Sequence, residues 1–307
     1  MKIVVTGSSG LIGTALVDSL RTSGHEVVAL VRRPVQPDES AARWDPTAGT
    51  IDAHALEGVD AAVNLGGAGI GDKRWTDDYK RAVLETRTRG TDLLARTLAG
   101  LDRPPQVLVS GSAVGYYGDA GSEVVDETAP AGDDFLARVC VQWEAAADPA
   151  RDAGIRVATI RTGIVLSGHG GALAKLLPLF RFGLGGRLGS GSQWWSWISL
   201  DDEVAAIRWL LDHDVAGPVN VVAPSPATNA ELTRTLGVVL HRPTVLPVPS
   251  FGPKLLLGSE LAEALLFTSQ RAVPAALERS GFRFTHPDLE GALRHVLDRP
   301  ASGTEAA

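Results

Sequence analysis

The chain has 307 residues, of which 44% are hydrophobic, and its formal net charge at pH 7 is −7. This hydrophobic content supports a large buried core, in one domain or two coupled ones, and excludes an intrinsically disordered chain. The acidic balance argues against a nucleic-acid-binding surface, which needs clustered Lys and Arg. No nucleic-acid partner is therefore expected.

The single cysteine, Cys140, cannot form an internal disulfide, and no signal peptide is recognisable, so we expect a cytoplasmic protein. By itself, Cys140 is expected to be a packed core residue. No apolar run approaches the roughly 20 residues that span a bilayer, so no membrane partner is expected. The sequence predicts nothing about the oligomeric state.

Residues 3–13 join an apolar run to three glycines at three-residue spacing, followed by a helical pattern. This predicts a strand, a phosphate-binding loop and a helix start, in which glycines permit a sharp turn, approach of a pyrophosphate and close helix packing. The spacing differs from G-x-G-x-x-G, and a glycine turn without a ligand is the alternative. The cofactor contacts expected here are Gly7, Ser9, Gly10, Leu11, Ile12 and Gly13.

The second apolar run, residues 26–31, ends at Arg32 and Arg33, where dinucleotide-binding folds contact the adenosine ribose. An acidic residue there accepts a hydrogen bond from the ribose 2′-hydroxyl, whereas an arginine favours a 2′-phosphate. The arginines therefore predict NADP(H) as the cofactor. Two solvated arginines that simply end a strand are the alternative.

Strand and helix patterns then alternate along the first half of the chain. Residues 42–45 are a candidate edge strand, and residues 60–65 are a buried strand that runs into glycines, where Leu65 and Gly66 are expected to contact the cofactor. Residues 76–98 predict a long helix. The next strand, residues 106–110, is followed by hydroxyl side chains just beyond its carboxyl end, where parallel sheets bind ligands.

The second half continues the alternation with a helix over residues 134–148 and a strand over 156–161. Residues 163–191 are rich in glycine and predict a flexible cover around a short helix, 173–182. Trp194, Trp195 and Trp197 follow, and they form either a substrate wall or the packing of an inserted lobe. The remaining expected elements are a helix from Ser199, a strand over 219–222, a capping box over 228–231 and an apolar helix over 255–267.

This alternation, with right-handed crossovers, predicts an α/β fold: a Rossmann-type doubly wound parallel sheet with a smaller C-terminal substrate-capping domain. The expected dinucleotide-binding domain is residues 1–165, with 198–223 returning to it. Residues 166–197 and 224–300 are the expected capping lobe, and 301–307 a disordered tail. The cleft between lobe and sheet is the expected substrate site.

Several stretches together resemble the short-chain dehydrogenase/reductase superfamily in its extended or atypical epimerase/dehydratase branch: residues 6–13, 64–67, 73–75, 112–118, 185–193, 197–202 and 279–284. Nearly the whole chain is similar to bacterial epimerase-family proteins with an uncharacterised C-terminal extension, some labelled cell-division-inhibitor homologues. The resemblance implies a Rossmann fold that binds NADP(H), with Ser112 as the catalytic serine. It also implies cofactor contacts at Arg87 and Ser110, and substrate contacts at Trp75, Gly163, Gln193 and Trp197.

The acid/base pair of that superfamily, a tyrosine followed four residues later by a lysine, is absent. Residues 135–144, where the pair should fall, contain neither residue, and Arg87 stands where extended members usually have asparagine. Tyr116 and Tyr117 follow Ser112 and are candidate substitutes for the proton donor, if a cation such as Arg87 or Lys73 lies near them. Tyrosines that pack a loop are the alternative.

The seven histidines show no H-E-x-x-H arrangement and no cysteine partners, so no dedicated metal site is expected. The leading hypothesis is an NADP(H)-dependent oxidoreductase or epimerase that acts on a small carbonyl, alcohol or sugar-nucleotide-like compound. The alternative is a catalytically degenerate NADP(H)-binding protein with a regulatory or partner-binding role.

Overall fold

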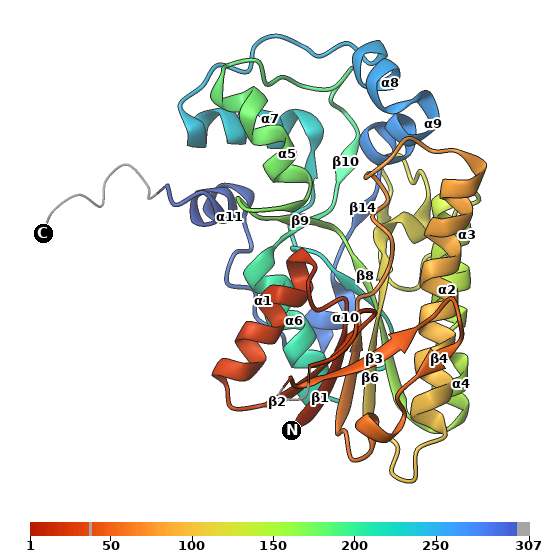
Figure 1. The fold of residues 1–307 in the computed structure, drawn as a ribbon. Helices are drawn as coiled ribbons and strands as arrows, with labels where there is room; N and C mark the ends of the chain where they lie inside the picture. The colour runs from red at the N-terminus through yellow and green to blue at the C-terminus, as the bar shows by residue number, and fades with distance from the viewer. Residues whose placement is uncertain (37–38, 300–307) are drawn as a thin grey trace, which may run out of the picture. The chain divides into compact units, whose positions relative to one another are not determined.

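The computed structural model describes residues 1–36 and 39–299 (Figure 1). Its internal contacts divide the chain into two compact units. Unit 1 comprises Met1–Tyr116, Asp133–Arg161 and Val204–Val219, and unit 2 comprises Tyr117–Gly132, Thr162–Glu203 and the chain from Asn220. The tail expected at residues 301–307 lies outside the described residues.

The central element is a sheet of eight strands in the order β12-β8-β6-β5-β1-β2-β3-β4. β1 pairs in parallel with both β2 and β5, so strand order reverses beside β1, as a doubly wound sheet requires. β4, at one edge, pairs antiparallel with β3. The strands are β1 Lys2–Thr6, β2 Glu26–Val31, β3 Ala41–Asp45, β4 Thr50–Ile51, β5 Ala61–Asn64, β6 Val107–Ala113, β8 Arg156–Thr162 and β12 Gly217–Val221.

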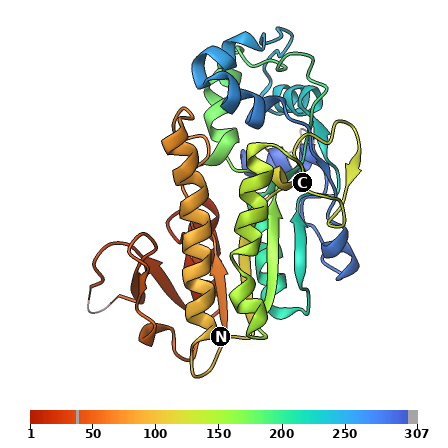
Figure 2. The same cartoon turned by 90° about the vertical axis from the view of Figure 1, so that its right-hand side faces the viewer.

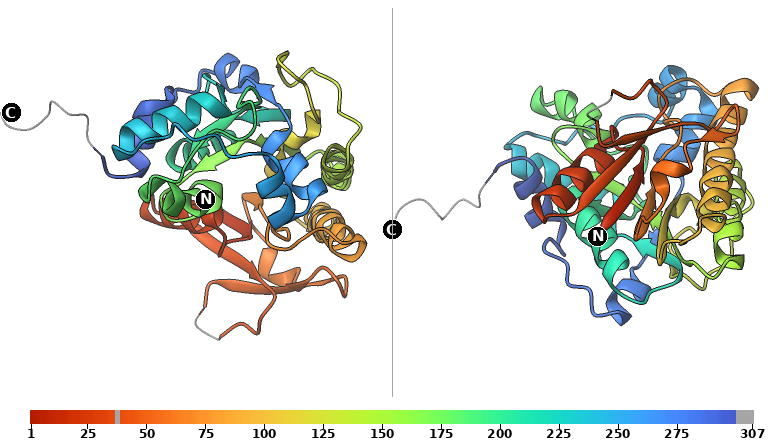
Figure 3. Two further views of the ribbon diagram at one scale, coloured as in Figure 1. Left: turned by 90° about the horizontal axis from the view of Figure 1, so that it is seen from above. Right: turned by 60° about the horizontal axis from the view of Figure 1, so that its bottom comes forward.

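Helices cover both faces of this sheet, which explains why β1 is apolar on both sides. Figure 1 shows α1 on one face and α2 and α3 on the other, and Figure 2 shows α2 and α3 running side by side. Figure 3 shows the strands between these helical layers from below. The helices are α1 Leu11–Thr22, α2 Asp77–Ala99, α3 Phe135–Ala145, α4 Asp148–Asp152 and α6 Leu200–Asp212, with short 3-10 turns at η1 His54–Leu56 and η2 Val114–Tyr117.

Unit 2 combines short two-stranded sheets with helices around its own apolar core. β10 pairs antiparallel with β13, whereas β11 pairs in parallel with β9 and β14 in parallel with β7. Its strands are β7 Val124–Val125, β9 Ile164–Leu166, β10 Trp194–Trp195, β11 Trp197–Ser199, β13 Ala227–Thr228 and β14 Arg271–Ala272. Its helices are α5 Gly171–Arg181, α7 Asn229–Leu240, α8 Phe251–Leu257, α9 Ser259–Ala262, the π-helix η3 Glu263–Phe267, α10 Ala275–Arg279 and α11 Leu289–Val296.

The capping box predicted over residues 228–231 is confirmed, because Thr228 and Glu231 open α7 in this way. The helix predicted over residues 76–98 is α2, and Thr76 caps its start by accepting a hydrogen bond from the Tyr79 N–H group. The predicted apolar helix over residues 255–267 is wrong as one element. It is split into α8, α9 and η3 at Gly258, whose φ of 91° is incompatible with a right-handed helix.

Two further expectations differ from the structure. Residues 42–45 lie in β3, but β3 is not the edge, because β4 pairs on its outer side. Residues 117–132, expected in the dinucleotide-binding domain, belong to unit 2, since β7 pairs with β14 and the Ala120 N–H group donates to the Ser269 carbonyl at 2.8 Å. In the described part of the chain, no helix is both long and apolar enough to cross a membrane.

Candidate active site

The turn between β1 and α1 requires glycine for steric reasons. Gly7 has a φ of 66°, and a Cβ atom added to it would lie 2.7 Å from the Leu65 carbonyl oxygen. A Cβ atom at Gly13 would lie 2.1 Å from the Gly7 carbonyl oxygen. Both distances are shorter than real Cβ contacts, so the backbone of this turn packs too closely for any side chain at either position.

The first turn of α1 presents backbone N–H groups at this turn. Gly10 is the N-cap residue and makes no side-chain cap, and its own N–H group donates to the Gly7 carbonyl at 3.0 Å. Ser9 and Gly10 are exposed, while Leu11 and Ile12 are half-buried behind them. An uncapped helix start of this kind binds anions through its N–H groups and the positive end of the helix dipole. The residues present therefore fit the pyrophosphate of a dinucleotide.

The end of β5 is fixed by a buried hydrogen-bond network. Thr6 Oγ1 donates to Asn64 Oδ1 at 2.7 Å and accepts the N–H groups of Leu65 and Gly66, both at 3.0 Å. Asn64 Nδ2 in turn donates to Thr91 Oγ1 at 2.7 Å. The Leu65 and Gly66 N–H groups are therefore already paired, which leaves their carbonyl groups, the half-buried Leu65 side chain and the close approach at Gly66 for a ligand.

Ser110 lies behind this network rather than at an open surface. It is fully buried in β6, where its Oγ accepts a hydrogen bond from Asn64 Nδ2 at 3.4 Å. Ser110 therefore supports the end of β5 through this hydrogen bond.

The two arginines after β2 differ in their surroundings. Arg33 donates from Nη1 to Glu39 Oε2 at 2.7 Å and to the Pro34 carbonyl at 3.0 Å. This carboxylate raises the pKa of Arg33 and holds its guanidinium beside the chain. Arg32 is exposed, and within the described residues its side chain makes no hydrogen bond or ion pair. Arg32 is therefore the arginine better placed to meet an added phosphate.

Ser112, at the carboxyl end of β6, takes part in a charged group of unit 1. Its Oγ donates to Glu144 Oε1 on α3 at 2.7 Å. Arg161, at the end of β8, holds the same carboxylate at both oxygens, from Nε to Oε1 at 2.8 Å and from Nη2 to Oε2 at 3.0 Å. The side chains of Arg161 and Glu144 are only 4% and 14% exposed. This pairing fixes the Glu144 carboxylate against the serine hydroxyl.

Tyr116 belongs to the same group, whereas Tyr117 does not. The Arg161 guanidinium lies over the Tyr116 ring, 3.4 Å from its centroid. Tyr117 lies in unit 2, where its hydroxyl donates to Asn220 Oδ1 at 2.6 Å in a buried pair. The structure thus brings together Ser112, Tyr116, Glu144 and Arg161, and it separates Tyr117 from them.

The other cations considered for Tyr116 face different rings. Arg87 lies over Trp143 at 4.9 Å, and Lys73 lies over Tyr79 at 5.8 Å. Arg87 is buried, which lowers its pKa, and Nη1 donates to the carbonyls of Ala68 at 2.9 Å and Val83 at 3.0 Å. The structure gives Arg87 the role of holding the loop after β5.

Cys140 is a buried thiol beside the Ser112 and Glu144 pair. It packs inside α3 with Sγ 3.7 Å from the Ala113 carbonyl, and burial raises the pKa of its thiol to about 12. The thiol therefore stays protonated and behaves as the core residue that was expected.

The residues expected to contact substrate have packing roles in the structure. Trp75, half-buried in unit 1, donates from its indole to the Ile70 carbonyl at 3.0 Å. In unit 2, a Cβ atom on Gly163 would lie 2.6 Å from the Ser196 carbonyl oxygen. Buried Gln193 donates from Nε2 to the Leu266 carbonyl at 2.9 Å, and Trp197 is fully buried and donates to the Ser225 carbonyl at 2.8 Å. Trp197 therefore packs in the apolar core of unit 2, as expected if the tryptophans form the packing of an inserted lobe.

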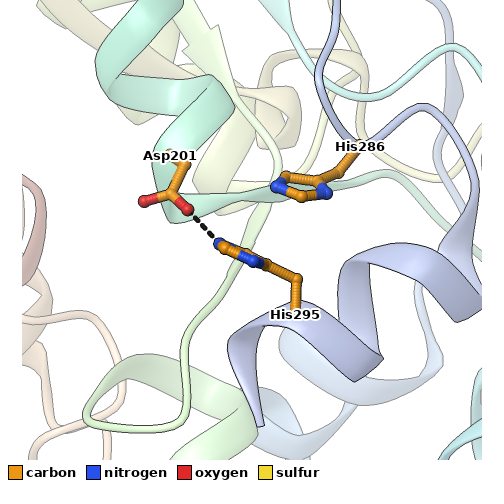
Figure 4. A group of neighbouring side chains, drawn as sticks. All are labelled: Asp201, His286 and His295. Carbon is orange, nitrogen blue, oxygen red and sulfur yellow. Dashed lines mark hydrogen bonds and ion pairs between the residues drawn. The ribbon is translucent and has the colours of Figure 1, made fainter. Parts of the chain in front are cut away.

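Sequence reasoning did not single out Glu144 or Arg161. Both residues could have been found as charged side chains within apolar patterns. Arg161 follows the buried run 157–160 of β8, and Glu144 follows the buried Trp143 on α3. Nor did it anticipate that Asp201, His286 and His295 gather in unit 2, within reach of one metal ion (Figure 4).

Comparison with known proteins shows that the chain matches two family models. Residues 3–223 match the model of the NAD dependent epimerase/dehydratase family, and residues 248–296 match a domain of unknown function, DUF1731. A curated relative, epimerase family protein Mb2239 of Mycobacterium bovis, is 45% identical over 299 residues, which cover 97% of this chain and 98% of that protein.

Two solved structures are similar over nearly the whole chain. Human epimerase family protein SDR39U1 (isoform 2), solved with NADPH, has a TM-score of 0.89 and 35% identity, covering 98% of this chain and 100% of that one. A nucleoside-diphosphate sugar epimerase from Corynebacterium glutamicum has a TM-score of 0.78 and 40% identity, covering 97% of this chain and 58% of that one.

Proposed function

We propose that this chain, which belongs to the NAD dependent epimerase/dehydratase family, is an NADP(H)-dependent oxidoreductase or epimerase. The observation that carries the proposal is the β1–α1 turn, where Gly7 and Gly13 admit no side chain and the first turn of α1 is uncapped. That turn suits a pyrophosphate. The similar human protein solved with NADPH supports the same cofactor. A net charge of −7 agrees with a small-molecule partner rather than a nucleic acid.

The preference for NADP(H) over NAD(H) rests on Arg32. Its guanidinium is exposed, whereas Arg33 is already paired with Glu39. In Arg32→Ala, we expect NADPH affinity to fall by at least about tenfold and NADH affinity to change little, because a charge-assisted bond to the 2′-phosphate is lost.

Calorimetric titration of both dinucleotides tests this, with Arg33→Ala as the matched control. Equal loss in the two variants would place the phosphate contact on both arginines. No binding of NADPH by the unmodified protein, or equal binding of NADH and NADPH in all three proteins, would contradict the proposal.

The proton chemistry is assigned to Ser112 and Glu144 in place of the missing tyrosine and lysine. A bound nicotinamide supplies or accepts the hydride. For alcohol oxidation, the substrate hydroxyl gives its proton to Ser112 Oγ as the serine proton passes to Glu144 Oε1, 2.7 Å away. Carbonyl reduction runs the same transfers in reverse. Arg161 holds both carboxylate oxygens, so it is a positioning residue.

Turnover of NADPH with a panel of small carbonyl and sugar-nucleotide compounds tests this assignment. We expect Ser112→Ala and Glu144→Gln each to lower kcat by about 10²–10⁴-fold, the usual contribution of a positioned acid or base. Tyr116→Phe tests the alternative donor. Ser23→Ala, which removes a hydroxyl that accepts from Arg208 at the far end of α1, is the control. Unchanged turnover in the first two variants would contradict the assignment.

A second function is favoured by one observation: among residues 135–144 of α3, the superfamily's tyrosine and lysine are both absent. A protein that binds NADP(H) without catalysis, in a regulatory or partner-binding role, would bind NADPH tightly and turn over no substrate. The binding and turnover experiments therefore separate the two functions.

A further inference from the structure

We propose that Asp201, His286 and His295 of unit 2 form a binding site for a divalent transition metal of the zinc type. One ligand atom from each residue lies within 4.8 Å of the others, and Figure 4 shows the three side chains turned toward a common point. All three lie in unit 2, so the site does not depend on the proposed cofactor or reaction.

Three separate segments supply these side chains. Asp201 lies in the first turn of α6, His286 lies in the loop before α11, and His295 lies in the last turn of α11. His295 and Asp201 are 94 residues apart in sequence and yet share a hydrogen bond between Nε2 and Oδ2. No local sequence pattern brings them together, which is why the histidine spacing gave no sign of a metal site.

The backbone around the site is fixed by buried contacts. The fully buried Asp202 carboxylate accepts the N–H groups of Thr285 at 2.8 Å and His286 at 2.9 Å, and this ties the His286 loop to the start of α6. Ala292 and Leu293 anchor α11 in the core of unit 2 on its other face. The side chains of Asp201 and His295 therefore extend from backbone positions that the fold determines.

The side chains themselves can adjust to a metal. Those of His295 and Asp201 are 49% and 60% exposed, and the two imidazole rings stack at 4.1 Å with an interplanar angle of 23°. Zinc ligands at about 2.0–2.2 Å in a tetrahedron lie about 3.3 Å from one another. A bound ion would replace the proton between His295 and Asp201, and small rotations would bring His286 to the same ion.

The donor set selects the class of metal. Two imidazoles and one carboxylate suit zinc and its neighbours in the first transition series, whereas magnesium and calcium require mainly oxygen ligands. Three protein ligands leave a fourth position for water. Because the metal would bind only the folded arrangement of these distant segments, it would also stabilise unit 2 by linkage.

Calorimetric titration of the metal-free, full-length protein with Zn²⁺ tests the site, and thermal melts with and without Zn²⁺ provide a second measurement. We expect one Zn²⁺ per chain. His286→Ala and His295→Ala should each weaken binding by more than the roughly 10–100-fold that loss of an outer-shell partner causes. Asp201→Asn should weaken it while keeping the shape of the side chain. Mg²⁺ should not compete.

The control is His54→Ala, which removes an exposed histidine of unit 1 and should leave Zn²⁺ affinity unchanged. Melts without metal show whether each variant folds. The proposal would be overturned if the folded His286→Ala and His295→Ala variants bound Zn²⁺ as tightly as the unmodified protein. Equal losses in the control, or Zn²⁺ that raised no melting temperature, would overturn it too.

Discussion

Glu144 in unit 1 and Glu203 in unit 2 are both withdrawn from water, but their surroundings differ. Arg161 holds Glu144 at both oxygens, and Ser112 donates to it as well. Glu203 is fully buried and accepts only a hydrogen bond from Thr162 Oγ1, at 2.9 Å, while its Oε2 has no hydrogen-bond partner among the described residues. Burial raises the pKa of Glu203 to about 8.

This difference shows that the neighbours of a buried carboxyl group determine whether it is charged or neutral. Glu144 has a guanidinium beside it, so its carboxylate forms an ion pair and accepts a hydrogen bond from the Ser112 hydroxyl, an arrangement that suits proton transfer. Where no cation is supplied, the group keeps its proton instead. Chemistry is therefore expected at Glu144, and a structural role at Glu203.

The largest effect should come from breaking the ion pair of unit 1. Arg161→Met leaves the Glu144 carboxyl group buried without its cation. Glu144 must then stay charged without a cationic partner or take up a proton, and because both states cost free energy we expect a loss on the order of 3–5 kcal/mol in the free energy of unfolding. Urea unfolding followed by circular dichroism measures it. The double variant Arg161→Met, Glu144→Gln removes both charges and should recover much of the loss. A loss below about 1 kcal/mol in the single variant would mean that the pair is solvated.

Glu203 should make stability fall as pH rises. The unfolded side chain ionises near its ordinary value of 4.5, whereas the folded one keeps its proton up to about pH 8. The stabilisation is therefore complete below pH 4.5 and is lost as pH rises through 8. Relative to Glu203→Gln, the unmodified protein should lose on the order of 4 kcal/mol between pH 5 and pH 9, because each unit of pKa difference corresponds to about 1.4 kcal/mol.

Urea unfolding at several pH values gives this difference, because all other titrating groups are common to both proteins. Thr162→Val removes the hydroxyl that donates to Oε1 and lowers the pKa of Glu203, so this variant should continue to lose stability to a higher pH. Parallel stability curves for Glu203→Gln and the unmodified protein would contradict a buried neutral carboxyl group.

An exposed pair provides the contrast to both buried carboxyl groups. Asp201 and His295 share a hydrogen bond, and their side chains are 60% and 49% exposed. Without metal, Asp201→Asn should therefore change the free energy of unfolding by no more than about 1 kcal/mol. Thermal melts in the presence of a chelator measure this. A larger loss would show that the pair is stabilised by more than its own charges.

Much of the fold could be predicted because its signals are local. The glycine turn, the capping box that begins at Thr228 and the alternation of strands and helices each depend on residues a few positions apart. The interruption at Gly258 was missed because an apolar pattern continues across it. A positive φ there, rather than hydrophobicity, ends α8.

The candidate site was predicted less completely because its contacts are distant in sequence. Glu144 and Arg161 are 17 residues apart, on a helix and a strand, and Ser112 is 32 residues from Glu144. A tryptophan such as Trp197 fits either a substrate wall or a core, and only tertiary packing decides between them.

Cys140 is a buried thiol that, like Glu203, is expected to stay protonated, and its reactivity gives the smallest of the predicted effects. Burial, and then the charge of Glu144, raise the pKa of this thiol to about 12, so almost no thiolate forms at pH 8. Iodoacetamide should leave the native protein nearly unlabelled, as mass spectrometry would show, and should label it at an ordinary thiol rate in urea. Since Arg161→Met brings no positive charge to the thiol and leaves it buried, that variant should not speed the native reaction unless α3 opens. Rapid labelling of the unmodified native protein would instead place Cys140 in a solvated site and weaken the case that this face of α3 excludes water.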